Sequence, residues 1–199
     1  MGDMAAARVT QVNISAAAEA RTDPQPTPDT EAMIETPTMN PRTHTELQSF
    51  LGKVHRLLSE MESWCDSENL SSQRTPISIS EEEYGHYNTD QLKISTKAGK
   101  HIADVTPIGA SILGANGRID IKGPHDKIIL VDLDAGGPTT TKSTTPPEDG
   151  NPPRTRHFYK GIDTPGWYWI DNRASSRGHK LDRDLFLNLL AEVSDHERN

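Results

Sequence analysis

One stretch, residues 105–134, constrains the fold more than any other part of the chain. At its centre the dipeptide Asn116-Gly117 stands between two apolar runs. Asn and Gly are the residues that best tolerate the positive φ required at both central positions of a two-residue type I′ turn. The sequence therefore predicts a β-hairpin that reverses direction at these two residues.

The apolar pattern on either side of that turn agrees with a hairpin. In the predicted register Ile112 faces Ile121, and Gly114 faces Ile119. Alternate residues of a strand lie on the same face, so these four positions fall together. One face of the predicted hairpin is therefore apolar.

The run Ile128-Ile129-Leu130-Val131 follows and is apolar at every position. Its β-branched residues favour a strand, and the absence of alternation is typical of a strand that is covered on both faces. We therefore expect a second buried strand beside the hairpin.

Two amphipathic helices flank the predicted strands. The first runs from Thr43 to about Asp66, begins with a capping box formed by Thr43 and Glu46, and repeats apolar residues at spacings of three and four. The second runs from about Asp182 to Ser194, with Asp182 as the N-cap. We expect the first helix to pack on the sheet. The alternative is a homodimer formed through this 43–66 helix.

Composition divides the chain into a tail and a domain. Residues 1–42 contain Pro, Thr and Ala with few large apolar groups, so we expect a disordered tail. Residues 135–155 are rich in Pro, Gly and Thr and predict a mobile loop. The predicted fold is a single α+β domain over residues 43–199, an antiparallel sheet of five to seven strands packed by an N-terminal and a C-terminal amphipathic helix.

Charge and cysteine content limit the binding partners and the cellular compartment that we expect for the protein. The formal charge of −8 argues against nucleic-acid binding over the whole surface. Cys65 is the single cysteine, which excludes an internal disulfide and favours a cytoplasmic location, and we interpret it as a small core residue. No stretch approaches the roughly 20 apolar residues that span a bilayer, so we expect no membrane association.

Metal ligands are not predicted from the histidines. Their spacing does not match a zinc site, and a single cysteine removes the usual structural zinc ligands. The histidines in question are His86, His101, His125, His157 and His179. We therefore expect no metal and no other cofactor.

A catalytic alternative rests on Asp104, Asp120 and Lys122. Metal-dependent nucleases place one Asp on a strand and an Asp-x-Lys pair on the next, so that two carboxylates hold Mg²⁺ while the lysine steadies the attacking water. In the predicted hairpin Asp120 and Lys122 share the polar face. Solvent-facing residues of an antiparallel sheet give the same pattern.

Residues 154–180 depart from the acidic composition of the whole chain. They contain six basic against two acidic residues, together with five aromatic residues. Trp, Tyr and Arg are enriched at protein-interface hot spots, although the same residue types also bind nucleic acid or form a core strand. We expect a partner-binding surface made by Arg156, Tyr159, Trp167, Trp169, Arg173 and Arg177.

These patterns favour a non-enzymatic protein-binding module, an adaptor, regulator or inhibitor-type partner. Another protein is the expected partner, and nucleic acid is the less favoured one. The alternative is a metal-dependent hydrolase, a nuclease, that uses the Asp104, Asp120 and Lys122 set with Mg²⁺.

Overall fold

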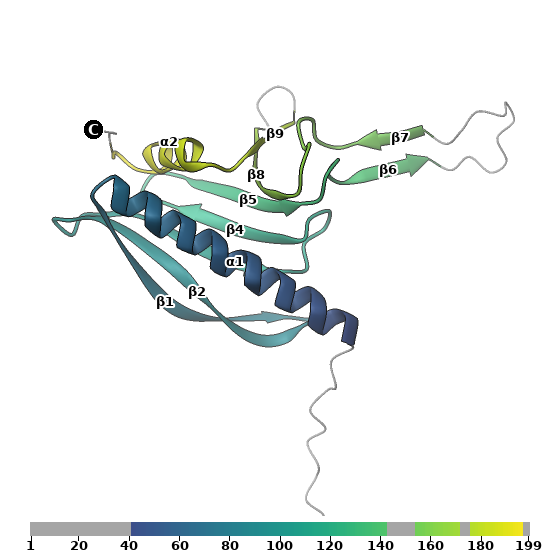
Figure 1. Ribbon diagram of the computed structural model, residues 1–199, viewed down its shortest axis with the longest axis horizontal. Helices are drawn as coiled ribbons and strands as arrows, with labels where there is room; N and C mark the ends of the chain where they lie inside the picture. Colours follow the sequence, from purple (N-terminus) through teal and green to yellow (C-terminus); the bar gives the residue numbers. More distant parts are fainter. Residues whose placement is uncertain (1–40, 143–153, 172–175, 197–199) are drawn as a thin grey trace, which may run out of the picture. The chain divides into compact units, whose positions relative to one another are not determined.

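The computed structural model describes residues 41–142, 154–171 and 176–196. These residues form two helices and an antiparallel sheet of seven strands, which confirms the α+β class and the antiparallel sheet of the prediction (Figure 1). The predicted N-terminal tail, apart from its last two residues, lies outside the described residues.

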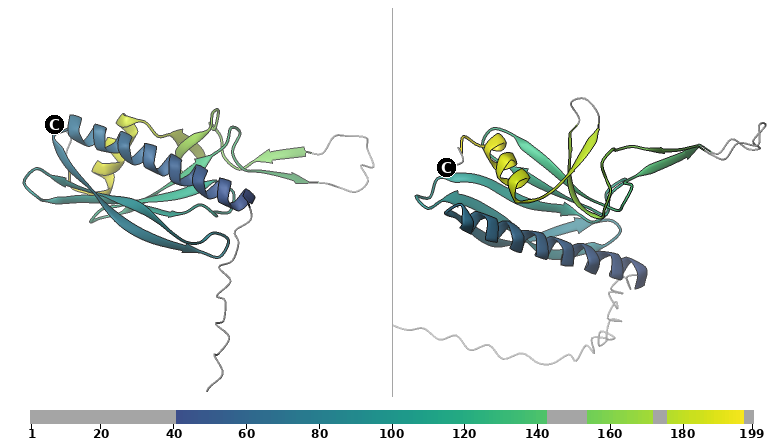
Figure 2. Two further views of the ribbon diagram at one scale, coloured as in Figure 1. Left: turned by 60° about the horizontal axis from the view of Figure 1, so that its bottom comes forward. Right: turned by 45° about the horizontal axis from the view of Figure 1, so that its top comes forward.

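The seven strands pair in the order β1-β2-β3-β4-β5-β8-β9. Their bounds are β1 Leu70–Glu81, β2 Gly85–Thr96, β3 His101–Gly109, β4 Gly117–Lys122, β5 Lys127–Leu133, β8 Gly166–Asp171 and β9 Arg177–Lys180. Two short strands, β6 (Thr139–Lys142) and β7 (Arg154–His157), pair with each other in a separate two-stranded sheet that extends away from the larger one (Figures 1 and 2).

Helix α1 spans Pro41–Ser67, and its apolar stripe is buried in the hydrophobic core. It begins two residues before the predicted start, because Pro41 lacks the N–H that a first turn leaves unbonded. Thr43 therefore lies inside the helix, and the predicted capping box is wrong. The stripe contributes these buried side chains: Leu47, Phe50, Val54, Leu57, Leu58, Met61 and Cys65. Burial raises the pKa of the Cys65 thiol to about 12, as suits a core residue.

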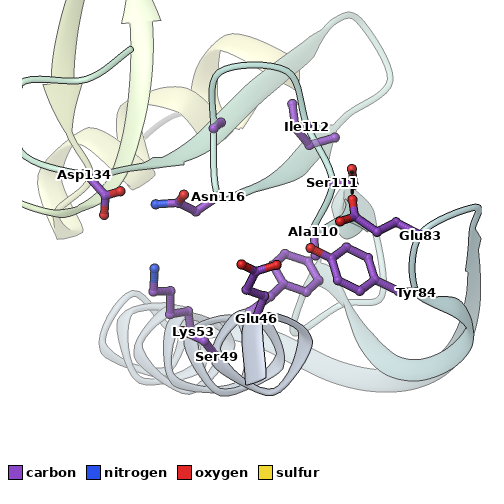
Figure 3. Close-up of a pocket in the computed structure, with 12 residues that line it drawn as sticks. Glu46, Ser49, Lys53, Glu83, Tyr84, Ala110, Ser111, Ile112, Asn116 and Asp134 are labelled. Atoms are coloured by element: carbon purple, nitrogen blue, oxygen red, sulfur yellow. Dashed lines mark hydrogen bonds between the residues drawn. The ribbon is translucent and has the colours of Figure 1, made fainter. Parts of the chain in front are cut away.

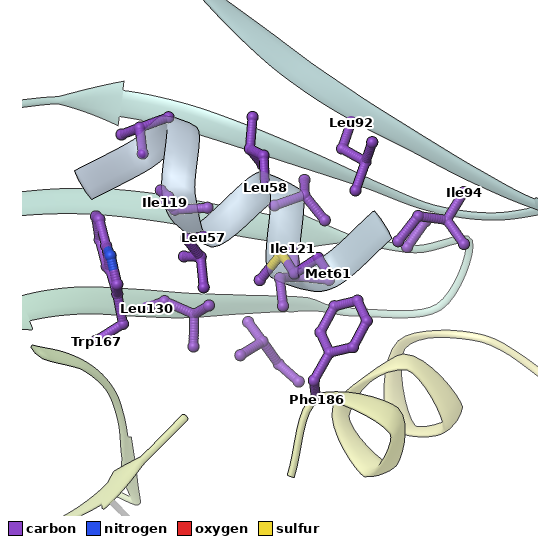
Figure 4. Packing of buried hydrophobic residues seen from close by; sticks show 14 of the residues in the cluster. Leu57, Leu58, Met61, Leu92, Ile94, Ile119, Ile121, Leu130, Trp167 and Phe186 are labelled. Atoms are coloured by element: carbon purple, nitrogen blue, oxygen red, sulfur yellow. The ribbon is translucent and has the colours of Figure 1, made fainter. Parts of the chain in front are cut away.

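The core is a set of rows that run across the sheet. Leu92, Val105, Ile121 and Ile128 oppose one another on four successive strands, and all four are buried. The side chains of α1 and of α2 (Arg183–Val193) complete the same cluster, and Figure 4 shows Leu58, Met61 and Phe186 beside these rows. Asp182 caps α2 as predicted, since its Oδ1 accepts from the N–H of Leu185 at 2.8 Å.

The predicted hairpin at Asn116-Gly117 is wrong. β3 ends at Gly109 and β4 begins at Gly117, so that a seven-residue loop, 110–116, joins them. The tight reversal lies within this loop, where the N–H of Ala115 donates to the carbonyl of Ile112 at 3.1 Å and Gly114 has a φ of 80°. Ile121 consequently pairs with Val105, not with Ile112.

Tertiary packing explains why a glycine stands at position 117. Its φ is not positive, but a Cβ at this position would lie 2.6 Å from the ring of Phe50. The glycine therefore permits a close approach between α1 and the start of β4, a function that the local Asn-Gly signal does not reveal.

The strand at residues 128–131 is covered on one face. Ile128 and Leu130 are buried, whereas Ile129 is 40% exposed. The prediction of a strand is confirmed, and the prediction of cover on both faces is wrong. The alternation arises because Ile129 opposes Asp120 on the face that carries the charged residues.

Two polar segments contain strands. The sequence from Leu70 to Pro76 is typical of a polar connector, but it is the first half of β1, paired with β2 along its whole length. Within residues 135–155, β6 and the start of β7 form the small sheet, and residues 143–153 lie outside the described part of the chain. Both segments are polar, so their strand character depends on pairing and not on burial.

Candidate functional site

A cavity of about 460 Å³ opens beside the N-terminal half of α1 (Figure 3). Its walls come from α1, from the β1–β2 turn, from the 110–116 loop and from the end of β5. The polar groups that face it are Glu46, Ser49, Lys53, Glu83, Tyr84, Ser111, Asn116 and Asp134. We call this space the acidic cavity, because three carboxylates and one ammonium group line it.

The 110–116 loop is held in place by the carboxylate of Glu81. This carboxylate accepts from the backbone N–H of Ala110 at 3.0 Å and of Ser111 at 2.8 Å, and from the hydroxyl of Tyr87. A Cβ on Gly109 would lie 2.5 Å from Glu81 Oε1, so glycine is required for this contact. The loop is therefore fixed to a strand nearly thirty residues earlier in the chain.

Glu83 adds a second link between the β1–β2 turn and the loop. Its Oε2 accepts from Ser111 Oγ at 3.0 Å. Beside it, burial raises the pKa of the Tyr84 hydroxyl, and the charges of Glu83, Glu46 and Glu81 raise it further. Three carboxylates thus act on one hydroxyl, which indicates a negative potential at this end of the cavity.

Lys53 forms an ion pair at the other end of the cavity. Its Nζ lies 2.5 Å from Oδ2 of Asp132, whose side chain is only 2% exposed. Burial raises the pKa of Asp132, and the hydrogen bond and charge of Lys53 oppose that shift. Because Lys53 is already paired, its charge does not balance the rim carboxylates Glu83 and Asp134. Glu46, the third rim carboxylate, is paired with Arg42 at 2.9 Å.

A large apolar side chain projects beside this cavity. Leu113 is fully exposed in the 110–116 loop, although the loop itself is held by several hydrogen bonds. A single exposed Leu is common on protein surfaces. Here it lies between Ile112 and Ala115, which line the cavity.

A second charged region has the opposite sign. We call residues 139–142 and 154–160 the basic ribbon, since they contain four cationic residues and no Asp or Glu. The cations are Lys142, Arg154, Arg156 and Lys160. Counting the intervening 143–153, which include Glu148 and Asp149, the segment 139–160 retains a formal charge of +2.

Strand register fixes the backbone pairing of the ribbon. Thr140 pairs with Arg156, and Lys142 pairs with Arg154 two residues further along. Arg156 is exposed and makes no ion pair within the part of the chain that the structure describes. Phe158, which follows β7, is 56% exposed.

The structure distributes the six residues predicted to bind a partner among different surroundings. Trp167 is buried against the helices, and Trp169 is partly buried beside it, with its ring 5.6 Å from that of His179. Tyr159 packs on a small separate cluster of Leu133, Ile162 and Tyr168. Arg156 and Arg177 are exposed on different strands. Arg173 lies outside the described residues.

The three residues of the catalytic alternative do share one face of the sheet. Lys122 opposes Asp104, and Asp120 opposes Thr106 two pairs along. The carboxylate of Asp120 is bound by Arg118 at 2.7 and 2.9 Å, and Lys127 lies 3.3 Å away. Asp104 has His101 as its ion-pair partner, at 3.6 Å. Cations therefore surround Asp120.

No group of three or more His, Cys, Asp or Glu side chains with the geometry of a metal site occurs among the described residues. Within the same residues, neither helix is long and apolar enough to cross a membrane.

The chain matches no protein-family model, no curated protein and no solved structure. The site is therefore interpreted from its own geometry.

Sequence reasoning missed the cavity residues. Glu81 and Glu83 belong to an acidic run that resembles a solvated turn, and their partners are 28 to 30 residues away. Lys53 shares a helix face with the predicted apolar stripe, next to Val54, and its partner is 79 residues away. The packing of α1 on the sheet and the position of the 110–116 loop bring these pairs together, and neither has a local signal in the sequence.

Proposed function

We propose that this chain is a non-enzymatic protein-binding module that captures an acidic protein surface with its basic ribbon. The observation that carries the proposal is the concentration of cations, together with an exposed aromatic side chain, on a two-stranded segment outside the main sheet.

The proposal keeps the predicted class of function and narrows the predicted surface. Trp167 and Trp169 belong with the core cluster, so the binding energy has to come from exposed groups. On the basic ribbon, Arg156 and Phe158 are both exposed and stand two residues apart in the sequence. Arg and aromatic residues are the types that concentrate binding energy at protein interfaces.

Charge also sets the expected strength of this interaction. Exposed ion pairs contribute about 0.2–1 kcal/mol each and are screened by salt. We therefore expect weak, salt-sensitive capture in which electrostatic attraction accelerates encounter.

The test is retention of an acidic polypeptide by the immobilised full-length chain, with poly-L-glutamate as the probe and duplex DNA as the competing polyanion. We expect poly-L-glutamate to bind at low salt, and Arg156→Glu to weaken binding by about tenfold, since reversal removes one attraction and adds one repulsion. Phe158→Ala should also weaken it. Lys97→Glu, the same charge change at an exposed turn remote in sequence from the ribbon, is the matched control.

Two results would overturn the proposal. If poly-L-glutamate passes through unretained, the ribbon does not recognise acidic polypeptides. If duplex DNA is retained, poly-L-glutamate is not, and Arg156→Glu abolishes DNA retention, the partner is nucleic acid and not protein.

The hydrolase alternative has no observation that favours it over this proposal. Its central carboxylate, Asp120, is bound by Arg118 and Lys127. An Mg²⁺ ion at that carboxylate would have to compete with two cations already in place.

A further inference from the structure

We infer that the acidic surface recognised by the basic ribbon is the acidic cavity of a second copy of this chain, so that copies join head to tail. The inference rests on the proposed function and names its partner. It requires that the two surfaces are complementary in charge and that their charged groups are accessible. It also requires that the ribbon of one copy does not bind the cavity of the same copy.

The two surfaces are complementary in charge. Among the described residues the cavity carboxylates Glu83 and Asp134 form no ion pair, whereas Glu46 is paired with Arg42 at 2.9 Å and Lys53 is engaged by Asp132. A neighbouring depression lined by Glu81, Glu82 and Glu83 extends the acidic surface past the cavity. Copies that carry −8 overall repel one another on average, so a local patch of opposite sign decides the orientation in which they approach.

The groups at both surfaces are exposed and have room to meet. Asp134 and Glu83 are exposed at the cavity, and Arg156 is exposed on the ribbon. A cavity of about 460 Å³ is large enough to admit guanidinium or ammonium side chains between these carboxylates. Each surface also has an exposed apolar side chain, Leu113 at the cavity and Phe158 on the ribbon, and contact between them would remove both from water.

The cavity requires little ordering when it binds. Glu81 fixes the backbone of the loop at Ala110 and Ser111, and the N–H of Asn116 donates to the carbonyl of Asp132 at 2.8 Å. A surface that is ordered before binding loses less conformational entropy on association.

The ribbon is directed away from the cavity of its own copy. Its base is held by the N–H of Phe158, which donates to the carbonyl of Pro138 at 3.0 Å, and by a 2.8 Å contact between His157 Nδ1 and the carbonyl of Gly136. Figures 1 and 2 show β6 and β7 running outward from the end of β5 in all three views. The ribbon therefore meets the cavity of another copy, and such a head-to-tail contact closes into a ring or continues as a chain.

Sedimentation velocity of the full-length chain tests this inference. We expect species heavier than the monomer that grow with protein concentration at low salt and dissociate near about 1 M salt, where the screening length falls to about 3 Å. Arg156→Glu and Glu83→Lys should each raise the dissociation constant by about tenfold or more. The matched controls are Lys97→Glu and Glu60→Lys, which make the same charge changes at exposed residues outside both surfaces.

Mixing the two interface variants is the decisive step. Arg156→Glu keeps an intact cavity and Glu83→Lys keeps an intact ribbon, so an equimolar mixture regains one native contact and should associate again. A monomer at all concentrations, association that neither variant weakens, or a mixture that stays dissociated would each overturn the inference. Poly-L-glutamate retention measured on the same preparation then separates the two claims, because a monomer that retains it leaves the proposed function standing.

Discussion

The acidic cavity and the basic ribbon differ in how the fold supports them. The cavity is built on the core: Lys53 extends from a buried helix face, Asp132 lies almost entirely out of water, and Glu81 accepts three hydrogen bonds. The ribbon depends on its own backbone ladder and a few bonds at its base, and its Arg156 and Phe158 are exposed.

Charge density alone therefore does not say which residues matter for stability. Changes at the cavity should alter the free energy of unfolding as well as any binding, whereas changes on the ribbon should alter binding alone.

The largest effect is expected for Lys53→Met, which leaves Asp132 buried without its partner. Breaking a buried ion pair on one side costs about 3 kcal/mol, because the remaining charge is desolvated and unpaired. Urea unfolding should show this loss at neutral pH. The double variant Lys53→Met with Asp132→Asn should regain much of it, and a single variant that loses less than about 1 kcal/mol would show that the pair contributes little.

The destabilisation caused by Lys53→Met should also depend on pH. Burial already raises the pKa of Asp132, and removing Lys53 removes what opposes that shift. The folded state then binds a proton that the unfolded state, with an Asp pKa of about 4, has released. Stability is therefore greatest below that unfolded pKa and falls as pH rises through the folded one. The loss caused by Lys53→Met should be larger at about pH 8 than at about pH 5, and an equal loss at both would contradict this explanation.

A smaller effect is expected for Glu81→Ala, which removes the carboxylate that holds the 110–116 loop by hydrogen bonds. The N–H groups of Ala110 and Ser111 and the hydroxyl of Tyr87 lose their acceptor, and each buried group left without one costs about 1–3 kcal/mol. Water can reach this loop, so we expect about 2 kcal/mol in total. Hydrogen exchange at Ala110 and Ser111 should accelerate. The exposed neighbour Glu82→Ala is the control, and unchanged exchange in Glu81→Ala would show that other contacts hold the loop.

The elements that could be predicted from the sequence are those whose signal is local. The three-and-four spacing in α1 and the Asp182 cap of α2 each reflect interactions within a few residues, and both helices were found. Helix and strand periodicity describe which face is apolar, and they do so before any long-range contact is known.

The cavity could not be predicted because its contacts are long-range. Asn116-Gly117 has the composition of a tight turn, yet Gly117 is there to let the ring of Phe50 approach. Glu81 resembles a solvated acid until the folded loop brings Ala110 to it. The basic composition of residues 154–180 is visible in the sequence, but the pairing of β7 with β6 is not.

The smallest effect on stability is expected at the ribbon, and it is the strictest test of the comparison. Arg156 makes no ion pair among the described residues, and Phe158 keeps more than half of its surface in water. Arg156→Glu and Phe158→Ala should therefore change the free energy of unfolding by less than about 0.5 kcal/mol. Urea unfolding measured beside the binding assays checks this. If either variant is markedly destabilised, loss of binding reports a damaged fold, and the ribbon belongs with the cavity as a structural region; if both unfold like the native chain, any loss of binding reports the surface itself.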